Sequence, residues 1–458
     1  MTAQELRNTL KEIDHKSYPA YKSLRGSYNF GKYTLSIEHV QGDPFAAPSQ
    51  ISIHVLLKDA CFPDYTLASG TTRTALADFL LRSFSSEIAH YSFQAKGSGK
   101  SGLIEITHPG QEVFSRSDCE ITDKELIARF FIGFPANGRT INSRELEKIL
   151  FDFMPQCVEK SLMYKNLNPD RLRKHIFLAE DQQAIRCELS ARELTAFVAD
   201  GAVLPRESGI SQHPMKNAVA FSSPDTMRIT LSLPHAGNIS GMGIPRGITL
   251  IVGGGYHGKS TLLSALELGV YNHIAGDGRE YVISDETALK LRSEDGRFVK
   301  DVDISLFIND LPSRKDTHAF STEDASGSTS QAAGIIEGIE AGSRLFLIDE
   351  DTSATNFMVR DAFMQRVIQS DKEPITPFTA RARELYDNAG ISTILVAGSS
   401  GAFFHIADTI IQMDNYNAVD ITSKVKALLN EYPVPFDAAS PYMAPKSHRI
   451  MSKDPQGT

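Results

Sequence analysis

The sequence predicts a mixed α+β domain in its first half and an α/β domain with a parallel sheet in its second half. Three observations support this prediction. The chain has 458 residues, which is enough for two or three domains of ordinary size. Strand-like and helical segments follow one another without a visible repeat up to residue 204, and strand–turn–helix units begin after residue 226. A stretch of mostly polar residues, 205–225, lies between the two halves.

In the first half, residues 30–57 alternate between apolar and polar side chains as paired strands do, around a loop rich in Gly and Pro. Residues 72–90 and 143–165 have helical spacing, whereas residues 103–107 and 126–134 are strand-like. These segments predict an α+β domain.

In the second half, residues 227–233 and 247–254 read as strands separated by a glycine-rich turn. Periodicity weakens after Tyr416, and the last residues look like a loose tail. We therefore expect three parts, which are an α+β domain (1–220), an α/β domain (221–430) and a C-terminal tail (431–458).

The composition is that of a soluble globular protein, with 41% hydrophobic and 22% charged residues. No apolar run approaches the roughly 18 residues that span a membrane. The N-terminus lacks the apolar segment of a signal peptide. The four cysteines are far apart, which argues against a disulfide scaffold and a CxxC metal site. We therefore expect a cytoplasmic protein with no membrane partner.

Charge is distributed unevenly along the chain. Residues 1–220 contain 26 Lys+Arg and 26 Asp+Glu, so the net charge of −9 lies entirely in the second half. Overall acidity argues against indiscriminate coating of DNA, because that affinity comes from phosphate neutralisation by Lys and Arg. A local basic surface in the neutral half remains compatible with this charge.

The segment GGGYHGKST (253–261) has the spacing G-x-x-x-x-G-K-[ST] of a phosphate-binding P-loop. Glycines let successive backbone N–H groups face a phosphate, the lysine adds a charge, and the serine hydroxyl can bind Mg²⁺. An apolar strand precedes the loop and a helical stretch follows it, as the motif requires. The residues expected to bind nucleotide are Gly253, Gly254, Gly255, Tyr256, His257, Gly258, Lys259, Ser260 and Thr261.

A second segment, KGSGKSGLIEI (96–106), also contains G-K-S. The position five residues before Gly99 is Gln94 rather than glycine, and a strand-like segment follows instead of a helix. We interpret this segment as a glycine-rich turn.

The apolar segment RLFLIDED (344–351) predicts a strand that ends at Asp349 and Glu350. An acid at the end of such a strand can hold the Mg²⁺ shell, and the next carboxylate can orient an attacking water. Any buried strand can end in acids, but one that follows a P-loop by about ninety residues favours this chemistry. We expect Ser260 and Asp349 to bind the metal, and Glu350 and Lys259 to be catalytic.

This spacing resembles the ATP-binding-cassette (ABC) class, in which a signature serine precedes the magnesium-site aspartate by 23 residues. Here ASGST (325–329) places Ser326 23 residues before Asp349. The segment after Glu350, DTSATN, resembles the D-loop of that class.

Three segments have amino-acid sequences similar to those of the bacterial family of predicted ATPases of the ABC class. They are the P-loop, DASGSTSQAAGIIEGIEAG and LIDEDTSATNFMVRD. Upstream segments such as HVQGDPFAAPSQ are also similar, so the resemblance covers nearly the whole chain. It implies a P-loop NTPase fold of the ABC type, with ATP and Mg²⁺ as cofactors.

Two positions of the class are less clear. Cassette transporters have a switch histidine ten residues before the aspartate that opens the last strand, and the corresponding residue here is Gly398. A neighbouring serine, Ser399 or Ser400, or backbone N–H groups would have to replace it. Asn309 is our candidate for the Q-loop amide, and the alternative is an asparagine that caps a turn.

The resemblance implies ATP held between the P-loop of one subunit and Ser326, Gly327 and Ser328 of another, and hence a homodimer. We expect an ATPase that acts on RNA or DNA through its N-terminal domain, where RLRKH (171–175) is either a binding patch or a solvated helix face. A nucleotide-gated scaffold with slow turnover is the main alternative, and a transporter subunit is a weaker one.

Overall fold

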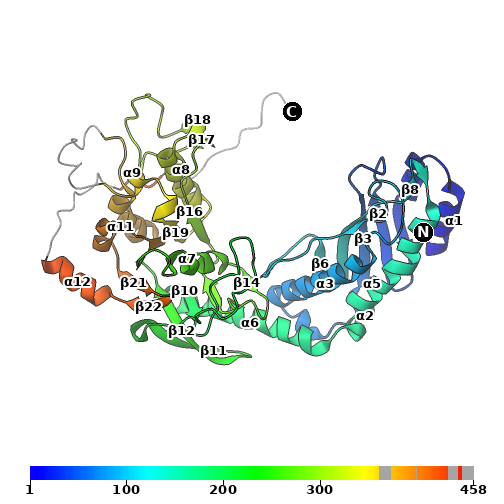
Figure 1. Ribbon diagram of the computed structural model, residues 1–458, viewed down its shortest axis with the longest axis horizontal. Helices are drawn as coiled ribbons and strands as arrows, with labels where there is room; N and C mark the ends of the chain where they lie inside the picture. Colours follow the sequence, from blue (N-terminus) through cyan, green and yellow to red (C-terminus); the bar gives the residue numbers. More distant parts are fainter. Residues whose placement is uncertain (361–372, 399, 432–441, 446–458) are drawn as a thin grey trace. The chain divides into compact units, whose positions relative to one another are not determined.

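The computed structural model describes residues 1–360, 373–398, 400–431 and 442–445. Its contacts divide the chain into two compact units (Figure 1). Unit 1 comprises residues 1–183 and 272–276, and unit 2 comprises the remainder. The predicted tail, 431–458, lies almost wholly outside the described residues.

The division differs from the expected boundary at residue 220. Strand β10 (Leu194–Ala199) pairs with β12 (Gly237–Pro245) and with β15 (Val282–Ser284), so its backbone hydrogen bonds place it in unit 2. The chain passes from unit 1 to unit 2 within helix α6 (Pro169–Ala191). The segment 205–225 is therefore a loop of unit 2 rather than a connection between domains.

Unit 1 is built on an antiparallel sheet with the strand order β1-β2-β3-β7-β4, in which β6 also pairs with β7. Strand β3 pairs with β7 over eight residues, from Ser49 opposite Ile132 to Leu56 opposite Glu125. The strands of this sheet are β1 (Gly26–Asn29), β2 (Thr34–His39), β3 (Ser49–Leu56), β4 (Ile104–Glu105), β6 (Cys119–Ile121) and β7 (Glu125–Ile132).

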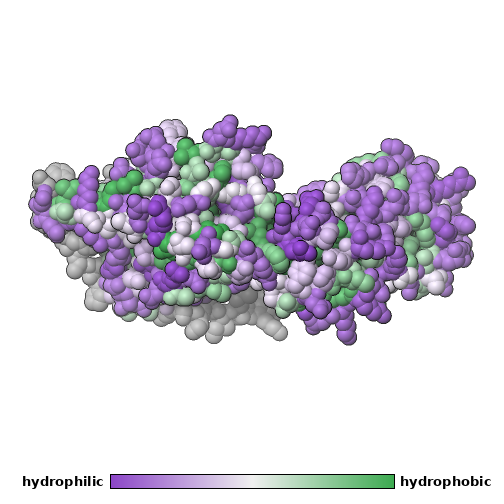
Figure 2. Space-filling view, turned by 90° about the horizontal axis from the view of Figure 1, so that it is seen from below, coloured by the Kyte–Doolittle hydropathy of each residue, from purple (hydrophilic) through white to green (hydrophobic). Residues whose placement is uncertain are grey.

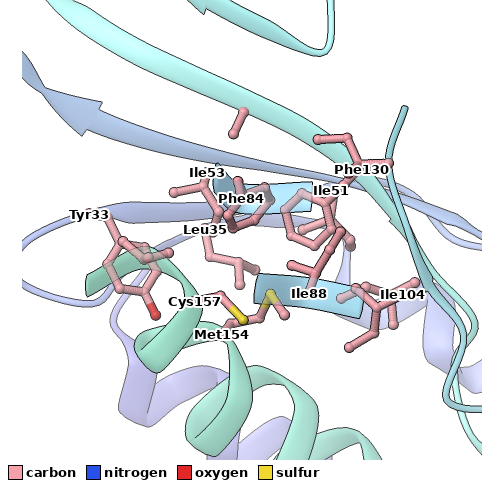
Figure 3. Packing of buried hydrophobic residues seen from close by; sticks show 14 of the residues in the cluster. Tyr33, Leu35, Ile51, Ile53, Phe84, Ile88, Ile104, Phe130, Met154 and Cys157 are labelled. Carbon is pink, nitrogen blue, oxygen red and sulfur yellow. The ribbon is translucent and has the colours of Figure 1, made fainter. Parts of the chain in front are cut away.

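Helices cover one face of this sheet and build the core of unit 1 (Figure 3). Phe84 and Ile88 of α3, with Met154 and Cys157 of α5, face strand residues such as Ile51. Apolar and polar residues alternate along β3 from Ile51 to Val55, and the buried Ile51, Ile53 and Val55 place their side chains on one face of the sheet, which carries this core. The helices of unit 1 before α6 are α1 (Ala3–Ile13), α2 (Leu57–Ala60), α3 (Gly70–Tyr91), α4 (Ser143–Glu147) and α5 (Met154–Ser161).

Unit 2 contains an antiparallel sheet, β11-β12-β10-β15, and a largely parallel sheet with the order β16-β19-β20-β13-β21-β22. In the second sheet only β22 is antiparallel to its neighbour. The remaining strands of these sheets are β11 (Arg228–Leu233), β13 (Ile248–Val252), β16 (Ala288–Leu291), β19 (Leu345–Asp349), β20 (Ser392–Val396), β21 (Thr409–Asp414) and β22 (Asn417–Asp420).

Helices α7 and α8 follow the two motifs that the sequence singles out, the P-loop and ASGST. The strands β19 and β20 are buried along their whole length, as expected for strands of a parallel sheet that is covered on both faces. The helices of unit 2 after α6 are α7 (Lys259–Leu268), α8 (Gly327–Glu340), α9 (Thr355–Met358), α11 (Phe378–Ala389) and α12 (Thr422–Glu431).

No helix within the described ranges is long and apolar enough to cross a membrane. The face drawn in Figure 2 is mostly hydrophilic over both units, and apolar residues are scattered between the polar ones.

A buried carboxylate joins α3 to other parts of unit 1. The side chain of Asp78 is fully buried and binds Arg82 at 2.6 Å, Arg116 at 2.9 Å and His175 of α6 at 3.4 Å. Burial opposes ionisation of Asp78, but the neighbouring His175 and the hydrogen bonds from Arg82 outweigh it and hold the pKa below its ordinary value. The carboxylate is therefore charged, and it neutralises two partly buried guanidinium groups.

We predict that Asp78→Asn lowers the free energy of unfolding by about 3–5 kcal/mol, because it leaves these cations without a buried counter-charge. Urea denaturation followed by far-UV circular dichroism measures this, since the chain has no tryptophan. Asp123→Asn removes a carboxylate that is 85% exposed and pairs with Arg73, so this control should cost less than about 1 kcal/mol.

The depressed pKa also fixes the pH dependence of this effect. The stabilisation by Asp78 is present above the unfolded-state pKa of about 3.9 and is lost as the pH falls through the lower folded-state pKa. The wild type and Asp78→Asn should therefore converge in stability at acid pH, and a gap that stays constant down to about pH 2 would contradict the assignment.

Candidate nucleotide-binding site

The P-loop connects a buried strand to a helix, as the sequence predicts. Strand β13 ends at Val252 and α7 begins at Lys259. Two glycines of the loop have φ angles that L side chains rarely adopt, +146° at Gly253 and +97° at Gly258. A Cβ atom at Gly253 would lie 2.4 Å from the carbonyl oxygen of Met413, so the loop passes directly over the end of β21.

The turn between β21 and β22 holds the loop in place. The backbone N–H of Asn415 donates to Nδ1 of His257 at 3.0 Å, and that of Tyr416 donates to the carbonyl oxygen of His257 at 3.0 Å. A Cβ atom at Gly258 would lie 2.7 Å from the Tyr416 ring. His257 therefore anchors the loop through the turn, a contact that the P-loop motif does not reveal.

The loop residues between the fixed glycines face solvent. Gly254, Gly255 and Tyr256 are exposed, and Tyr256 has a φ of +63° with its side chain 99% exposed. Thr261 lies in the first turn of α7 and borders a small apolar hollow. The other residues that line this hollow are Leu204, Pro205, Val219, Phe221, Gly258, Met413 and Tyr416.

Lys259 reaches back over the loop. Its Nζ donates to the carbonyl oxygens of Gly253 and Gly254 at 2.7 and 2.9 Å. The ammonium group is thus held at the concave side of the loop, at the N-terminal end of α7. A helix N-terminus carries a partial positive charge, so the lysine and the helix favour an anion at the same place.

The predicted metal ligands lie together. Ser260 Oγ donates to Oδ2 of Asp349 at 3.2 Å, although β20 separates their strands in the sheet. The other carboxylate oxygen of Asp349 accepts the backbone N–H of Asp351 at 3.2 Å. A hydroxyl and a carboxylate oxygen are hard donors of the kind that Mg²⁺ prefers, so this pair fits the metal that the motif implies.

Glu350 and Gly398 meet beside Lys259. The backbone N–H of Gly398 donates to Oε2 of Glu350 at 2.8 Å, and a Cβ atom on Gly398 would lie 3.8 Å from Nζ of Lys259. Gly398 thus reaches the site through its backbone. Ser400 binds the N–H of Ala402 through its side chain, and Ser399 lies outside the described residues.

The ASGST segment forms the N-terminus of α8. Ser326 is the N-cap and accepts the N–H of Thr329 at 3.4 Å. A Cβ atom at Gly327 would lie 2.4 Å from Ser293 Oγ, so this position has no room for a side chain. Ser328 Oγ donates to Oδ1 of Asn356 at 2.9 Å, which connects the helix start to the segment after Glu350.

A glutamine that the motifs do not include completes this connection. Gln331 is buried, its Nε2 donates to Ser353 Oγ at 3.0 Å, and its Oε1 accepts the N–H of Ala354 at 2.9 Å. The one signal in the sequence is a polar residue within the apolar run of a helix, which must find partners when buried.

Asn309 makes local contacts. Its Nδ2 donates to the carbonyl oxygen of Ser305 at 2.6 Å, and its backbone N–H donates to the carbonyl oxygen of Pro374 at 2.9 Å. These are the contacts expected of a turn-capping asparagine, and a role toward nucleotide stays a prediction.

A glycine loop between a buried parallel strand and a helix, facing a serine–aspartate pair, defines a P-loop nucleotide-binding domain. Residues 168–448 match the family model of the ABC ATPase P-loop domain, and residues 3–165 match that of the N-terminal domain of ATPases of the ABC class. The chain therefore belongs to the ABC-class ATPase family. This confirms the predicted family and fold class.

One curated relative matches about half of the chain. The chain is 28% identical over 253 residues to the uncharacterized protein MJ1628 of Methanocaldococcus jannaschii. This match covers 53% of the chain and 55% of that relative, so the chain spans about half the length of the curated protein it matches.

Two solved structures are similar to part of the chain. One is the ADP conformation of MJ1267, an ATP-binding cassette of an ABC transporter, which is 12% identical in sequence. This match covers 45% of our chain and 94% of that chain, with a TM-score of 0.28. The other is cbiO1 of Clostridium perfringens, which is 14% identical in sequence. This match covers 53% of our chain and 96% of that chain, with a TM-score of 0.30. At such scores the superpositions are loose, and nothing about this chain follows from them.

We predict that Gly258→Ala abolishes binding of a fluorescent ATP analogue, because the new methyl group would collide with Tyr416 and the φ of +97° would be strained. Gly255→Ala is the matched control, since a Cβ atom there meets nothing within 4 Å. Equal affinities of the two variants would show that the geometry of the loop does not govern binding.

Proposed function

We propose that the chain binds ATP with Mg²⁺ at the P-loop and hydrolyses it. The observation that carries this proposal is the convergence of Lys259, Ser260, Asp349 and Glu350 at one edge of the parallel sheet. Lys259 and the N-terminus of α7 would hold the β- and γ-phosphates. Ser260 and Asp349 would hold Mg²⁺, which would neutralise part of the charge on these phosphates.

Glu350 would act as the general base. Its carboxylate follows the metal-binding position directly and is fixed by the N–H of Gly398 at 2.8 Å. In this position it can accept a proton from a water that attacks the γ-phosphate. Gly398 would supply this backbone donor at the position where cassette transporters have a histidine.

We predict that Lys259→Ala abolishes or severely weakens ATP binding, since it removes the positive charge held at the loop. Glu350→Gln should bind ATP normally but hydrolyse it about 10²-fold more slowly or worse, because the base is lost. Phosphate release and binding of a fluorescent ATP analogue measure the two effects. Normal turnover in Glu350→Gln would mean that another group orients the water.

We also propose that ATP is sandwiched between two copies of the chain. The N-terminus of α8, with Ser326 and the N–H groups of Gly327 and Ser328, is suited to bind phosphate. Within the described part of the chain, no hydrogen bond joins these three residues to the P-loop of the same chain. A second copy that presents its own α8 to the P-loop would supply them.

We predict that ATP shifts Glu350→Gln from monomer to dimer in light scattering, and that adding Ser326→Arg blocks this shift through bulk and charge at the interface. Ser23→Arg introduces the same side chain at an exposed serine of unit 1, and it should leave the shift intact. A dimer that forms without ATP, or that tolerates Ser326→Arg, would contradict the sandwich.

Finally, we propose that turnover is coupled to RNA or DNA bound by unit 1. The support is the absence of net charge in residues 1–220 and the exposed cations of α6, Arg171, Arg173 and Lys174. An ATPase assay with and without RNA and DNA tests the coupling. Turnover that neither polymer changes would favour the nucleotide-gated scaffold.

A further inference from the structure

Three loops of unit 1 converge on one surface, which we call the three-loop surface. They are residues 42–47, 93–102 and 136–140, which precede β3, follow α3 and contain β8 (Ala136–Asn137). Hydrogen bonds lock them together, from the Lys100 N–H to the Pro44 carbonyl (2.8 Å), from the Ser98 N–H to the Ala136 carbonyl (2.7 Å) and from Arg139 Nε to Asp43 (2.7 Å).

Two phenylalanines on this surface face solvent. Phe45 is 63% exposed and Phe93 is 52% exposed. Phe93 has a φ of +62°, which is a rare conformation for a bulky residue, and its N–H donates to the Gly102 carbonyl at 2.7 Å. Glycine or asparagine would fit this backbone with less strain. An aromatic ring that is both strained and exposed indicates a role in binding rather than in folding.

Both phenylalanines border the glycine-rich turn that contains G-K-S. Phe93 begins the loop, and Cδ1 of Phe45 lies 3.0 Å from the place where a Cβ of Gly99 would be. The N–H groups of Ser98, Lys100, Ser101 and Gly102 all donate to carbonyl oxygens of the protein itself. These four N–H groups are therefore not available to a phosphate, which leaves side chains as the main means of binding an anion here.

The charged side chains of the three loops are mostly cationic. The three loops contain three cationic residues, Lys96, Lys100 and Arg139, and one acidic residue, Asp43, which pairs with Arg139. A further acid, Glu145, accepts the N–H of Lys96 and pairs with Lys148. The surface thus carries a net positive charge around its aromatic rings, whereas the whole chain has a net charge of −9.

We propose that the three-loop surface binds single-stranded nucleic acid. Bases stack on Phe45 and Phe93, and the phosphates between them contact Lys96, Lys100 and Arg139. Every base has a stacking face, so exposed rings interleaved with flexible cations suit a single strand of any sequence. In a duplex the base faces are covered and cannot reach the rings. This proposal specifies which surface of unit 1 binds nucleic acid and that the nucleic acid is single-stranded. Its coupling to ATP turnover rests on the proposed function.

The test uses the full chain and a fluorescein-labelled 12-nucleotide oligo(U) in anisotropy titrations at about 50 mM salt. Replacing both Phe45 and Phe93 by alanine should weaken binding by at least about fivefold for each ring, with little change in the salt dependence. Lys96→Ala with Lys100→Ala should instead flatten the plot of log K against log[salt] by about 0.7 for each phosphate that no longer meets a lysine. A 12-base-pair duplex should bind more weakly than the single strand.

Phe298→Ala is the matched control, because Phe298 is 61% exposed but lies on β17 (Arg297–Val302) of unit 2. It should bind the oligonucleotide like the wild type. Phe93→Gly removes the ring while relieving the strained backbone, so it separates the effect of stacking from an effect on folding. Equal circular dichroism spectra and equal basal ATPase rates show that the variants are folded.

The proposal is overturned if the wild type does not bind at about 50 mM salt, or if the double phenylalanine and double lysine variants bind like it. Neutralising Arg171, Arg173 and Lys174 tells whether the strand lies on α6 instead, and loss of binding only in that variant also overturns it. Basal ATPase activity without nucleic acid is measured separately. Oligonucleotide binding by an inactive chain would thus refute the proposed hydrolysis and leave this surface supported.

Discussion

The parallel pairing of β19, β20 and β13 is the constraint on which the candidate site depends. Parallel strands end at the same edge of a sheet, so the P-loop after β13, Asp349 at the end of β19 and Gly398 after β20 meet there. The sequence separates Ser260 from Asp349 by 89 residues, and the sheet brings them to 3.2 Å. A shift of register between these strands would move the serine, the aspartate and the glutamate apart together.

Two glycines and the turn between β21 and β22 determine the conformation of the P-loop at this edge of the sheet. Gly253 and Gly258 adopt positive φ angles, and the end of β21 and the Tyr416 ring leave no room for a Cβ atom at these two positions, so both positions favour glycine. His257 ties the loop to the same turn. On the other side, Gln331 joins α8 to the residues after Glu350. The P-loop and ASGST are thereby connected through β19 and the turn that follows it.

Local motifs made much of this accessible from the sequence, and non-local pairing accounts for the rest. The sequence reveals the P-loop because its chemistry needs fixed residue types at short spacing, and it reveals Asp349 because this residue ends an apolar strand. It does not reveal the place of β10, since that place is set by hydrogen bonds to β12 and β15, which lie far along the chain. It leaves the role of Gly398 open for a similar reason, because the contact of Gly398 to Glu350 comes from the backbone.

We propose that Ser260 and Asp349 form a metal site that completes the nucleotide site. Calorimetric titration of ATP into the chain, with and without Mg²⁺, measures it most directly when wild type and Asp349→Asn are compared. We predict that Mg²⁺ tightens ATP binding by the wild type and that Asp349→Asn loses most of this gain while still binding ATP through Lys259. A gain from Mg²⁺ that is equal in both proteins would contradict it.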